Sequence, residues 1–123
     1  MAQQRFHFGI GTPQQQGTYE QLRSLWVAAD LAPLIEDVWL FDHLIALGDD
    51  PKIPILEGWS LLAALATQTR RVRIGIQVTS NTFRYPAILA KQAATVDCIS
   101  GGRLNFGIGA GWNQREHRGY GVP

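Results

Sequence analysis

Short segments with the pattern of β-strands occur four times along the chain. In three of them, large apolar residues alternate with glycine or polar residues, which is the period of two expected of a strand. The other is a continuous apolar run, rich in the aromatic and branched residues that are common in strands. We therefore predict strands at residues 6–11, 37–41, 72–79 and 103–109.

Three longer segments between these strands repeat apolar residues at helical spacing. The first begins with the capping box Thr18 to Gln21, whose side chains satisfy free amide groups of the first helical turn, and Pro33 ends it. Its predicted apolar stripe is Leu22, Leu25, Trp26 and Ala29. The second helix covers residues 58–69, and the third runs from Pro86 to a stop at Gly101. The polar, glycine-rich chain after Gly111 is predicted to form no further element.

The distribution of apolar residues over the strand faces distinguishes two α/β architectures. A doubly wound sheet has helices on both faces, so its central strands should be apolar on both. Here Gly9, Gly75 and Gly107 share one face, and Val78 is assigned with the large apolar residues to the other. This division favours a curled sheet with helices only outside, as in a (β/α)8 TIM barrel. Such a barrel needs about 250 residues, so four parallel strands with three connecting helices are half of one.

Composition and charge restrict the class of partner. The chain has 123 residues, 46% of them hydrophobic, which suits one small globular domain. Its net charge of +1 comes from 11 basic and 10 acidic residues spread along the chain, so we expect no nucleic-acid or membrane partner. No apolar signal core or run of roughly 20 apolar residues occurs, which predicts a cytoplasmic protein. Its single cysteine, Cys98, is predicted to be a buried structural thiol.

Four motifs follow one another along the chain: Asp37 to His43, Leu56 to Ala66, Arg84 to Lys91, and Ser100 to Glu116. Their order and spacing resemble the bacterial-luciferase-like monooxygenases, especially the deazaflavin-dependent branch of that family. The resemblance implies that residues 1–123 are the N-terminal half of a (β/α)8 barrel. It also implies an oxidoreductase that binds FMN or coenzyme F-420 for hydride or oxygen transfer to a small organic substrate. A homodimer or higher oligomer, formed through the second and third helices, is a further implication.

The resemblance also implies positions for the site. His43 stands where the family keeps an active-site histidine, near the reactive edge of the flavin. Gln77 and Val78, followed by Thr79, stand where many members have a non-proline cis peptide that supports the central ring. The loop of Gly109, Ala110 and Gly111 stands where the family faces the cofactor. Because Ala110 replaces the arginine that binds the FMN phosphate in bacterial luciferase, the resemblance favours coenzyme F-420 over FMN.

Simpler interpretations compete with this site. His43 could simply form a hydrogen bond at a polar strand end, and Asp42 is interpreted as a structural residue. The glycines near residue 109 do not complete a dinucleotide fingerprint, because Trp112 stands where a glycine is needed. Glu116 and His117 lack the spacing of metal ligands and are assigned to a solvated loop, so no metal site is predicted. The alternative for the whole chain is a truncated half-barrel without catalysis, acting only as an oligomerising or interaction module.

Overall fold

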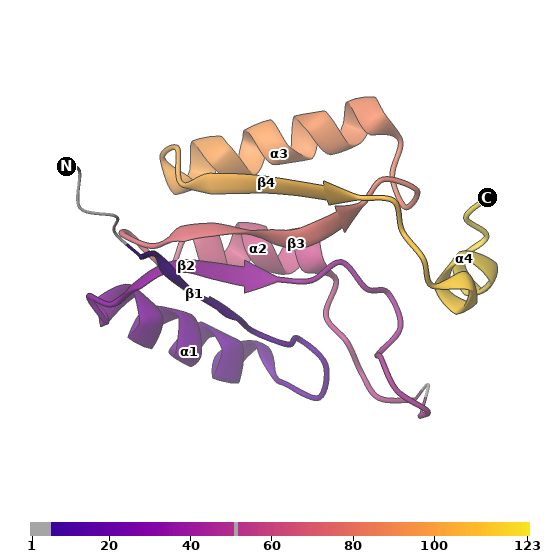
Figure 1. Cartoon of the computed structure of the whole chain (residues 1–123), viewed down its shortest axis with the longest axis horizontal. Helices are drawn as coiled ribbons and strands as arrows, with labels where there is room; N and C mark the ends of the chain where they lie inside the picture. Colours follow the sequence, from indigo (N-terminus) through magenta and orange to yellow (C-terminus); the bar gives the residue numbers. More distant parts are fainter. Residues whose placement is uncertain (1–5, 51) are drawn as a thin grey trace.

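Four parallel strands lie side by side in chain order in the computed structural model, which describes residues 6–50 and 52–123 (Figure 1). The strands are β1 (Phe8–Gly11), β2 (Ile35–Leu40), β3 (Arg73–Ser80) and β4 (Leu104–Gly109). The connecting helices are α1 (Tyr19–Leu31), α2 (Gly58–Ala66) and α3 (Pro86–Ser100). Sequential parallel strands joined by helices confirm the predicted alternation of strands and helices in an α/β fold. The order of the strands in the sheet is the one that a (β/α)8 barrel requires.

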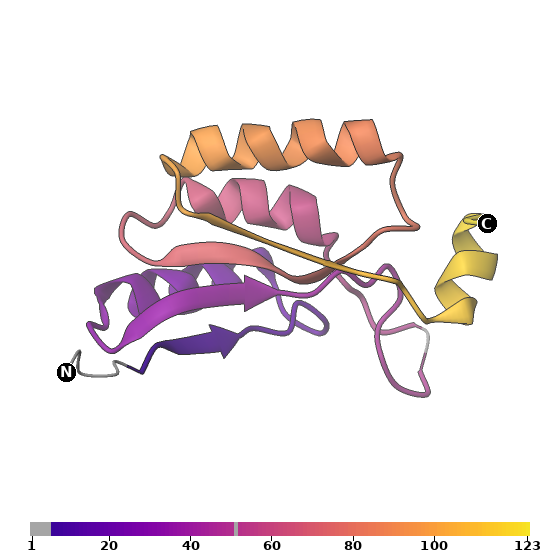
Figure 2. The same cartoon turned by 45° about the horizontal axis from the view of Figure 1, so that its top comes forward.

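The helices α1, α2 and α3 cover one face of the sheet and leave the other face without helices (Figure 2). The core therefore lies between the helices and the apolar side of the two central strands. Its fully or almost fully buried members include Trp26, Val38, Leu40, Leu62, Leu65, Ile74 and Ile76. This one-sided packing is the arrangement that the division of strand faces predicted.

Trp39 fills part of the opposite, glycine-lined face. A Cβ atom on Gly75 would lie 2.6 Å from the Trp39 ring and 2.4 Å from the carbonyl oxygen of Asn105. A Cβ on Gly9 would lie 3.2 Å from Nε1 of the same tryptophan. Gly9 and Gly75 therefore share one face, as predicted. Trp39 and the backbone of Asn105 leave no room for a side chain at Gly75, and Trp39 leaves only a tight fit at Gly9.

The predicted position of Val78 is wrong. The pairing of β3 with β4 shifts register between Ile76 and Thr79, and the peptide bond between Gln77 and Val78 is cis, as the resemblance implied. Val78 is 47% exposed, and Cβ atoms on Gly107 and on Gly109 would both contact its side chain, whereas Thr79 is fully buried. Alternation assigns side chains to the correct face of a sheet only while the pairing of the strands is regular. After the irregular stretch in β3, the faces are the reverse of those that alternation predicts.

Three further predictions about helices are corrected. The sequence pattern places Leu25 in the apolar stripe of α1, but this side chain is 44% exposed, and α2 ends at Ala66 rather than at residue 69. Cys98 is exposed, not buried. It follows the buried Val96 by two residues, which places it about 200° around α3 from the packed side. Within the described ranges, none of the helices has the length and apolar character needed to cross a membrane.

The chain after β4 forms a short helix, α4 (Gln114–Tyr120), which the sequence analysis did not predict. Asn113 caps it by accepting a hydrogen bond from the backbone N–H of Arg115, and Gly121 ends it in the left-handed conformation. The helix lies beyond the carboxyl ends of the strands, away from the other helices (Figure 1).

We expect the 123-residue chain to self-associate at micromolar concentration. The two edge strands expose large apolar side chains, since Phe8 is 50%, Phe106 48% and Ile108 56% exposed. In the described sheet each edge strand also has one side without a neighbouring strand, and that side can pair with another chain. Light scattering during size exclusion should give the mass of a dimer or larger species. The Ile108→Lys variant should give a lower mass, because it replaces an exposed apolar side chain of an edge strand with a charged one. A monodisperse monomer near 13.6 kDa would contradict this expectation.

Candidate active site

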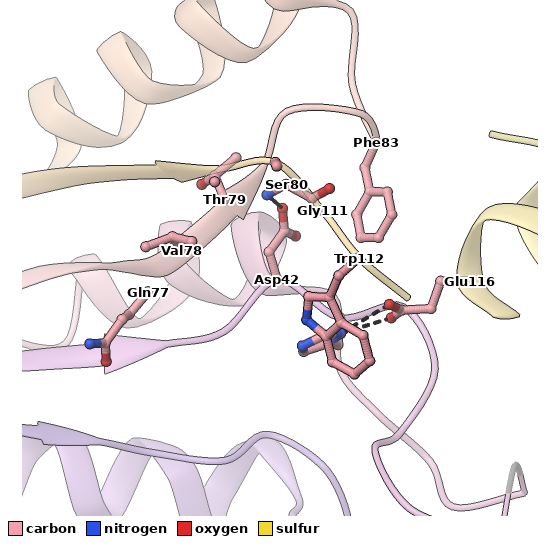
Figure 3. Close-up of a pocket in the computed structure, with 12 residues that line it drawn as sticks. Asp42, Gln77, Val78, Thr79, Ser80, Phe83, Gly111, Trp112 and Glu116 are labelled. Carbon is pink, nitrogen blue, oxygen red and sulfur yellow. Dashed lines mark hydrogen bonds and ion pairs between the residues drawn. The ribbon is translucent and has the colours of Figure 1, made fainter. Parts of the chain in front are cut away.

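A cavity of about 310 Å³ opens where the carboxyl ends of the strands meet (Figure 3). Because parallel strands present these ends at one edge of the sheet, residues distant in sequence converge there. All seven sequence-predicted site residues line it: His43, Gln77, Val78, Thr79, Gly109, Ala110 and Gly111. Five residues outside that set complete the lining: Asp42, Ser80, Phe83, Trp112 and Glu116.

His43 is held by a buried carboxylate. Its Nδ1 lies 3.0 Å from Oε2 and 3.2 Å from Oε1 of Glu116, which reaches the cavity from α4 (Figure 3). The imidazole ring also contacts two aromatic rings, with centroids 5.4 Å away in Phe41 and 5.8 Å away in Trp112. Within the described part of the chain, Nε2 of His43 has no hydrogen-bond partner, and the side chain is 16% exposed. His43 therefore has one anchored nitrogen and one available nitrogen.

Asp42 connects the ends of two neighbouring strands. Its buried carboxylate accepts a 2.8 Å hydrogen bond from the backbone N–H of Ser80 and two more, of 2.6 and 2.9 Å, from the guanidinium of Arg84. Arg84 also donates to Glu57, whose carboxylate caps α2 through the N–H groups of Trp59 and Ser60. These contacts support a structural role for Asp42 beside His43, because they join its carboxylate to the end of β3 and to Arg84.

Two groups of this network have shifted pKa values. Burial raises the pKa of the Glu57 carboxyl, but hydrogen bonds from Ser60, Trp59 and Arg84 outweigh burial and hold this pKa below its usual range. Burial likewise lowers the pKa of the Arg84 guanidinium, but the carboxylates of Asp42 and Glu57 outweigh it and raise that pKa. The folded protein therefore favours the ionised form of both groups.

We expect the stability advantage of the native protein over Glu57→Gln to disappear in acid. A carboxyl with a lowered folded-state pKa stabilises the fold above its unfolded pKa, near 4.5, and loses this contribution as pH falls through the folded-state value. Urea midpoints of both proteins should differ at pH 7 and converge as the pH falls below 4.5 and through the lowered folded-state pKa. Glu20→Gln is the control, because Glu20 is 70% exposed and its ion pair with Arg23 lies on the surface of α1. A difference that persists in acid would contradict the ionic explanation.

Sequence reasoning missed Glu116 and His117, which it placed in a solvated loop. Glu116 is fully buried, and His117 joins α4 to the loop before α3 through a 2.8 Å contact between Nε2 and the hydroxyl of Thr82. The sequence did contain a signal for this helix. Asn113 followed three residues later by Glu116 has the spacing of a helix start. No group of three or more potential metal ligands comes together among the described residues.

Comparison with known proteins identifies the family. The sequence model of the luciferase-like monooxygenase family matches residues 4–123. The chain belongs to this family. Among curated luciferase-like relatives is an F-420-dependent glucose-6-phosphate dehydrogenase from Amycolatopsis mediterranei, 37% identical over 79 residues that cover 63% of this chain and 23% of the relative.

Solved luciferase-like structures show the same fold. The F-420-dependent tetrahydromethanopterin reductase from Methanopyrus kandleri matches with a TM-score of 0.75 and 25% identity, covering 95% of this chain and 30% of that protein. The oxygenating component of 3,6-diketocamphane monooxygenase from Pseudomonas putida, solved with FMN, matches with a TM-score of 0.69 and 26% identity, covering 84% of this chain and 27% of that protein. The chain thus spans less than a third of the length of these relatives. Its four parallel strands are half the number in a luciferase-like (β/α)8 barrel.

The residues at the cavity fit the ring of a flavin-type cofactor better than its phosphate. Val78, Phe83 and Ala110 provide an apolar wall. Gly109 and Gly111, on either side of Ala110, add no side chains that would project into the cavity. The hydroxyl of Thr79 is buried without a partner among the described residues, so the wall also contains an unused polar atom. No lysine or arginine occurs among the described residues lining the cavity. A planar, largely apolar ring suits this lining, whereas a phosphate would find no cationic partner.

Proposed function

We propose that this chain supplies the N-terminal part of the active site of an oxidoreductase that uses coenzyme F-420 or FMN on a small organic substrate. One observation carries the proposal. His43, with one nitrogen anchored and the other available, lines the same cavity as the two backbone segments expected to hold the cofactor ring. A histidine with an available ring nitrogen in a partly enclosed pocket is a suitable proton donor or acceptor.

The cofactor and the chain would divide the chemistry between them. A bound flavin or deazaflavin would supply the two-electron redox step. Residues 77–79 and 109–111 would hold and orient the ring from two sides, and the apolar side chains of Val78 and Phe83 would exclude water from it. His43 would hold or transfer a proton at Nε2 while Glu116 keeps Nδ1 occupied.

Relatives with either cofactor support the general class. Members that use F-420 and members that use FMN both match this chain. Ala110 favours F-420, because its methyl group offers nothing to the FMN phosphate at the position where bacterial luciferase has an arginine. We therefore propose F-420 first and FMN second.

Phosphate-free ligands provide the sharpest test of the ring site. We expect the 123-residue chain to bind cofactors weakly and to bind riboflavin as well as FMN, and a phosphate-free deazaflavin as well as F-420. The reason is that its cavity has no cationic side chain for a phosphate. Fluorescence titration of the four ligands measures both ratios. A longer protein that includes the following barrel units should bind one phosphorylated cofactor more tightly.

A matched pair of variants locates the binding. Ala110→Leu should abolish binding because it fills the cavity wall, whereas Ala90→Leu adds the same side chain at an exposed position of α3 and should change nothing. Equal binding by both variants would place the ring elsewhere. Failure of both the chain and the longer protein to bind any of the four ligands would overturn the proposed function and favour the non-catalytic interaction module.

A further inference from the structure

The carboxylate of Glu116 contacts Nδ1 of His43 and the backbone N–H groups of Leu44 and Ile45. Its side chain is 1% exposed, and each of its carboxylate oxygens is engaged. We propose that Glu116 is a positioning residue that fixes neutral His43 in the tautomer with its proton on Nδ1, so that Nε2 is left as a bare acceptor at the cavity. The inference about tautomer stands on geometry alone, whereas its use in catalysis rests on the proposed function.

The donors around the carboxylate determine the tautomer. The backbone N–H groups of Leu44 and Ile45 donate to Oε1 of Glu116 over 2.6 and 3.1 Å. Oε2 then lies 3.0 Å from Nδ1 of His43. An ionised carboxylate only accepts hydrogen bonds, so Nδ1 has to provide the proton. A neutral imidazole carries a single N–H, and its other nitrogen, Nε2, is then an acceptor.

The groups around His43 do not compete for this proton. The rings of Phe41 and Trp112 contact it edge-on. The nearby carboxylate of Asp42 is already occupied by the backbone of Ser80 and by Arg84. Glu116 is therefore the partner that decides which nitrogen of His43 is protonated.

The helix that carries Glu116 is fastened to both sides of the cavity. His117 contacts the hydroxyl of Thr82 on one side, and the hydroxyl of Tyr120 donates to the carbonyl oxygen of Leu44 over 3.1 Å on the other. Glu116 itself binds the backbone of the loop that holds His43. The carboxylate and the imidazole thus belong to one connected unit, in which the ring cannot rotate without losing its contact between Nδ1 and Glu116.

This arrangement has a chemical consequence. A bare Nε2 can take a proton from a substrate, and the resulting imidazolium keeps its Nδ1–H bond to a negative carboxylate, which stabilises the charge. The opposite tautomer would present an N–H to the cavity and could not accept a proton there. Glu116 therefore acts through His43 and does not itself exchange a proton with the substrate.

The tautomer is measured directly by NMR of the 123-residue chain with ¹⁵N-labelled histidine, with the pH raised until the His43 spectrum is that of a neutral ring. Correlations between ring nitrogens and ring carbon-bound protons distinguish protonated from bare nitrogens, and a His43→Asn variant assigns the signals. We expect a protonated Nδ1 and a bare Nε2 for His43. His117 is an internal reference, because its Nδ1 lies 2.9 Å from the carbonyl oxygen of Asn113 and must donate to it. A protonated Nε2 in neutral native His43 would overturn the proposal without any variant.

Glu116→Gln should reverse the tautomer. The backbone N–H groups of Leu44 and Ile45 require an acceptor, so the amide oxygen should remain with them and the amide NH₂ group should face Nδ1. His43 should then carry its proton on Nε2. Glu36→Gln is the matched control, since Glu36 pairs with Nδ1 of the exposed His7 at 2.7 Å, and it should leave the His43 signals unchanged.

Each outcome decides one of the two proposals. An unchanged His43 tautomer in a folded Glu116→Gln protein would overturn the positioning role, even if cofactor binding is intact. Loss of cofactor binding in every titration would overturn the proposed function, even if the tautomer is as expected. If Glu116→Gln does not fold, the native spectrum alone still confirms or refutes the assigned tautomer.

Discussion

Replacing His43 by alanine should lower turnover by about 10²- to 10⁴-fold in an enzyme that contains this half-site, equivalent to roughly 3 to 5 kcal/mol of barrier. The reason is that we propose Nε2 of His43 as the proton-transfer atom at the cavity, because Glu116 holds the ring through Nδ1. Cofactor affinity should change much less, because the segments proposed to hold the ring, residues 77–79 and 109–111, are separate from this side chain. Steady-state kinetics combined with a cofactor titration separates the two effects.

The control for this prediction is His7→Ala. His7 also pairs with a glutamate through Nδ1, but its side chain is 64% exposed and does not line the cavity. Turnover should be unaffected by this change. If His43→Ala instead kept normal turnover and only lowered the melting temperature, His43 would be a structural residue at a strand end, as its simpler interpretation holds.

Trp26→Ala should destabilise the protein by about 3 to 5 kcal/mol, the usual cost of removing a large aromatic side chain from a core. Trp26 is fully buried, and its Nε1 donates a 3.0 Å hydrogen bond to the hydroxyl of Thr12, so the variant leaves both a cavity and a buried hydroxyl with one partner fewer. A loss of this size is a large fraction of the 5 to 15 kcal/mol typical of a whole domain. Urea denaturation measures it through the midpoint and slope.

Leu25→Ala is the matched control, one residue earlier on the same helix. Leu25 is 44% exposed, so its truncation should shift the free energy of unfolding by only about 0.5 kcal/mol. Similar losses at both positions would mean that α1 packs through a different face. Trp26→Phe adds a finer comparison, because it retains most of the apolar volume and removes the hydrogen bond to Thr12.

Much of the fold was predictable because its signals are local. The capping box at Thr18 and Gln21 forms both of its hydrogen bonds, and Pro86 and Gly101 begin and end α3 as expected. Such features depend on residues three or four positions apart, which constrain one another in any tertiary context. The glycines opposite Trp39 likewise reflect a steric demand that the alternating pattern already contains.

The chain order of site residues was also informative, since residues directly after parallel strands must meet at one edge of the sheet. That rule accounts for the convergence of His43 with the segments around Val78 and Ala110. It does not say which atoms are engaged once they meet. The partners of Asp42, for example, come from Ser80 and Arg84, which lie 38 and 42 residues further along the chain.

The sequence by itself therefore determined the βα order, the helix boundaries set by caps, the glycine-lined face and the edge of the sheet where the site lies. Only the tertiary structure decided that Val78 turns away from the helices, that Cys98 and Leu25 are exposed, and that α4 exists to bring Glu116 to His43. The physical reason is the range of the interactions. Caps and periodicity act between near neighbours, whereas the register shift in β3 and the burial of a carboxylate depend on segments as many as 73 residues apart.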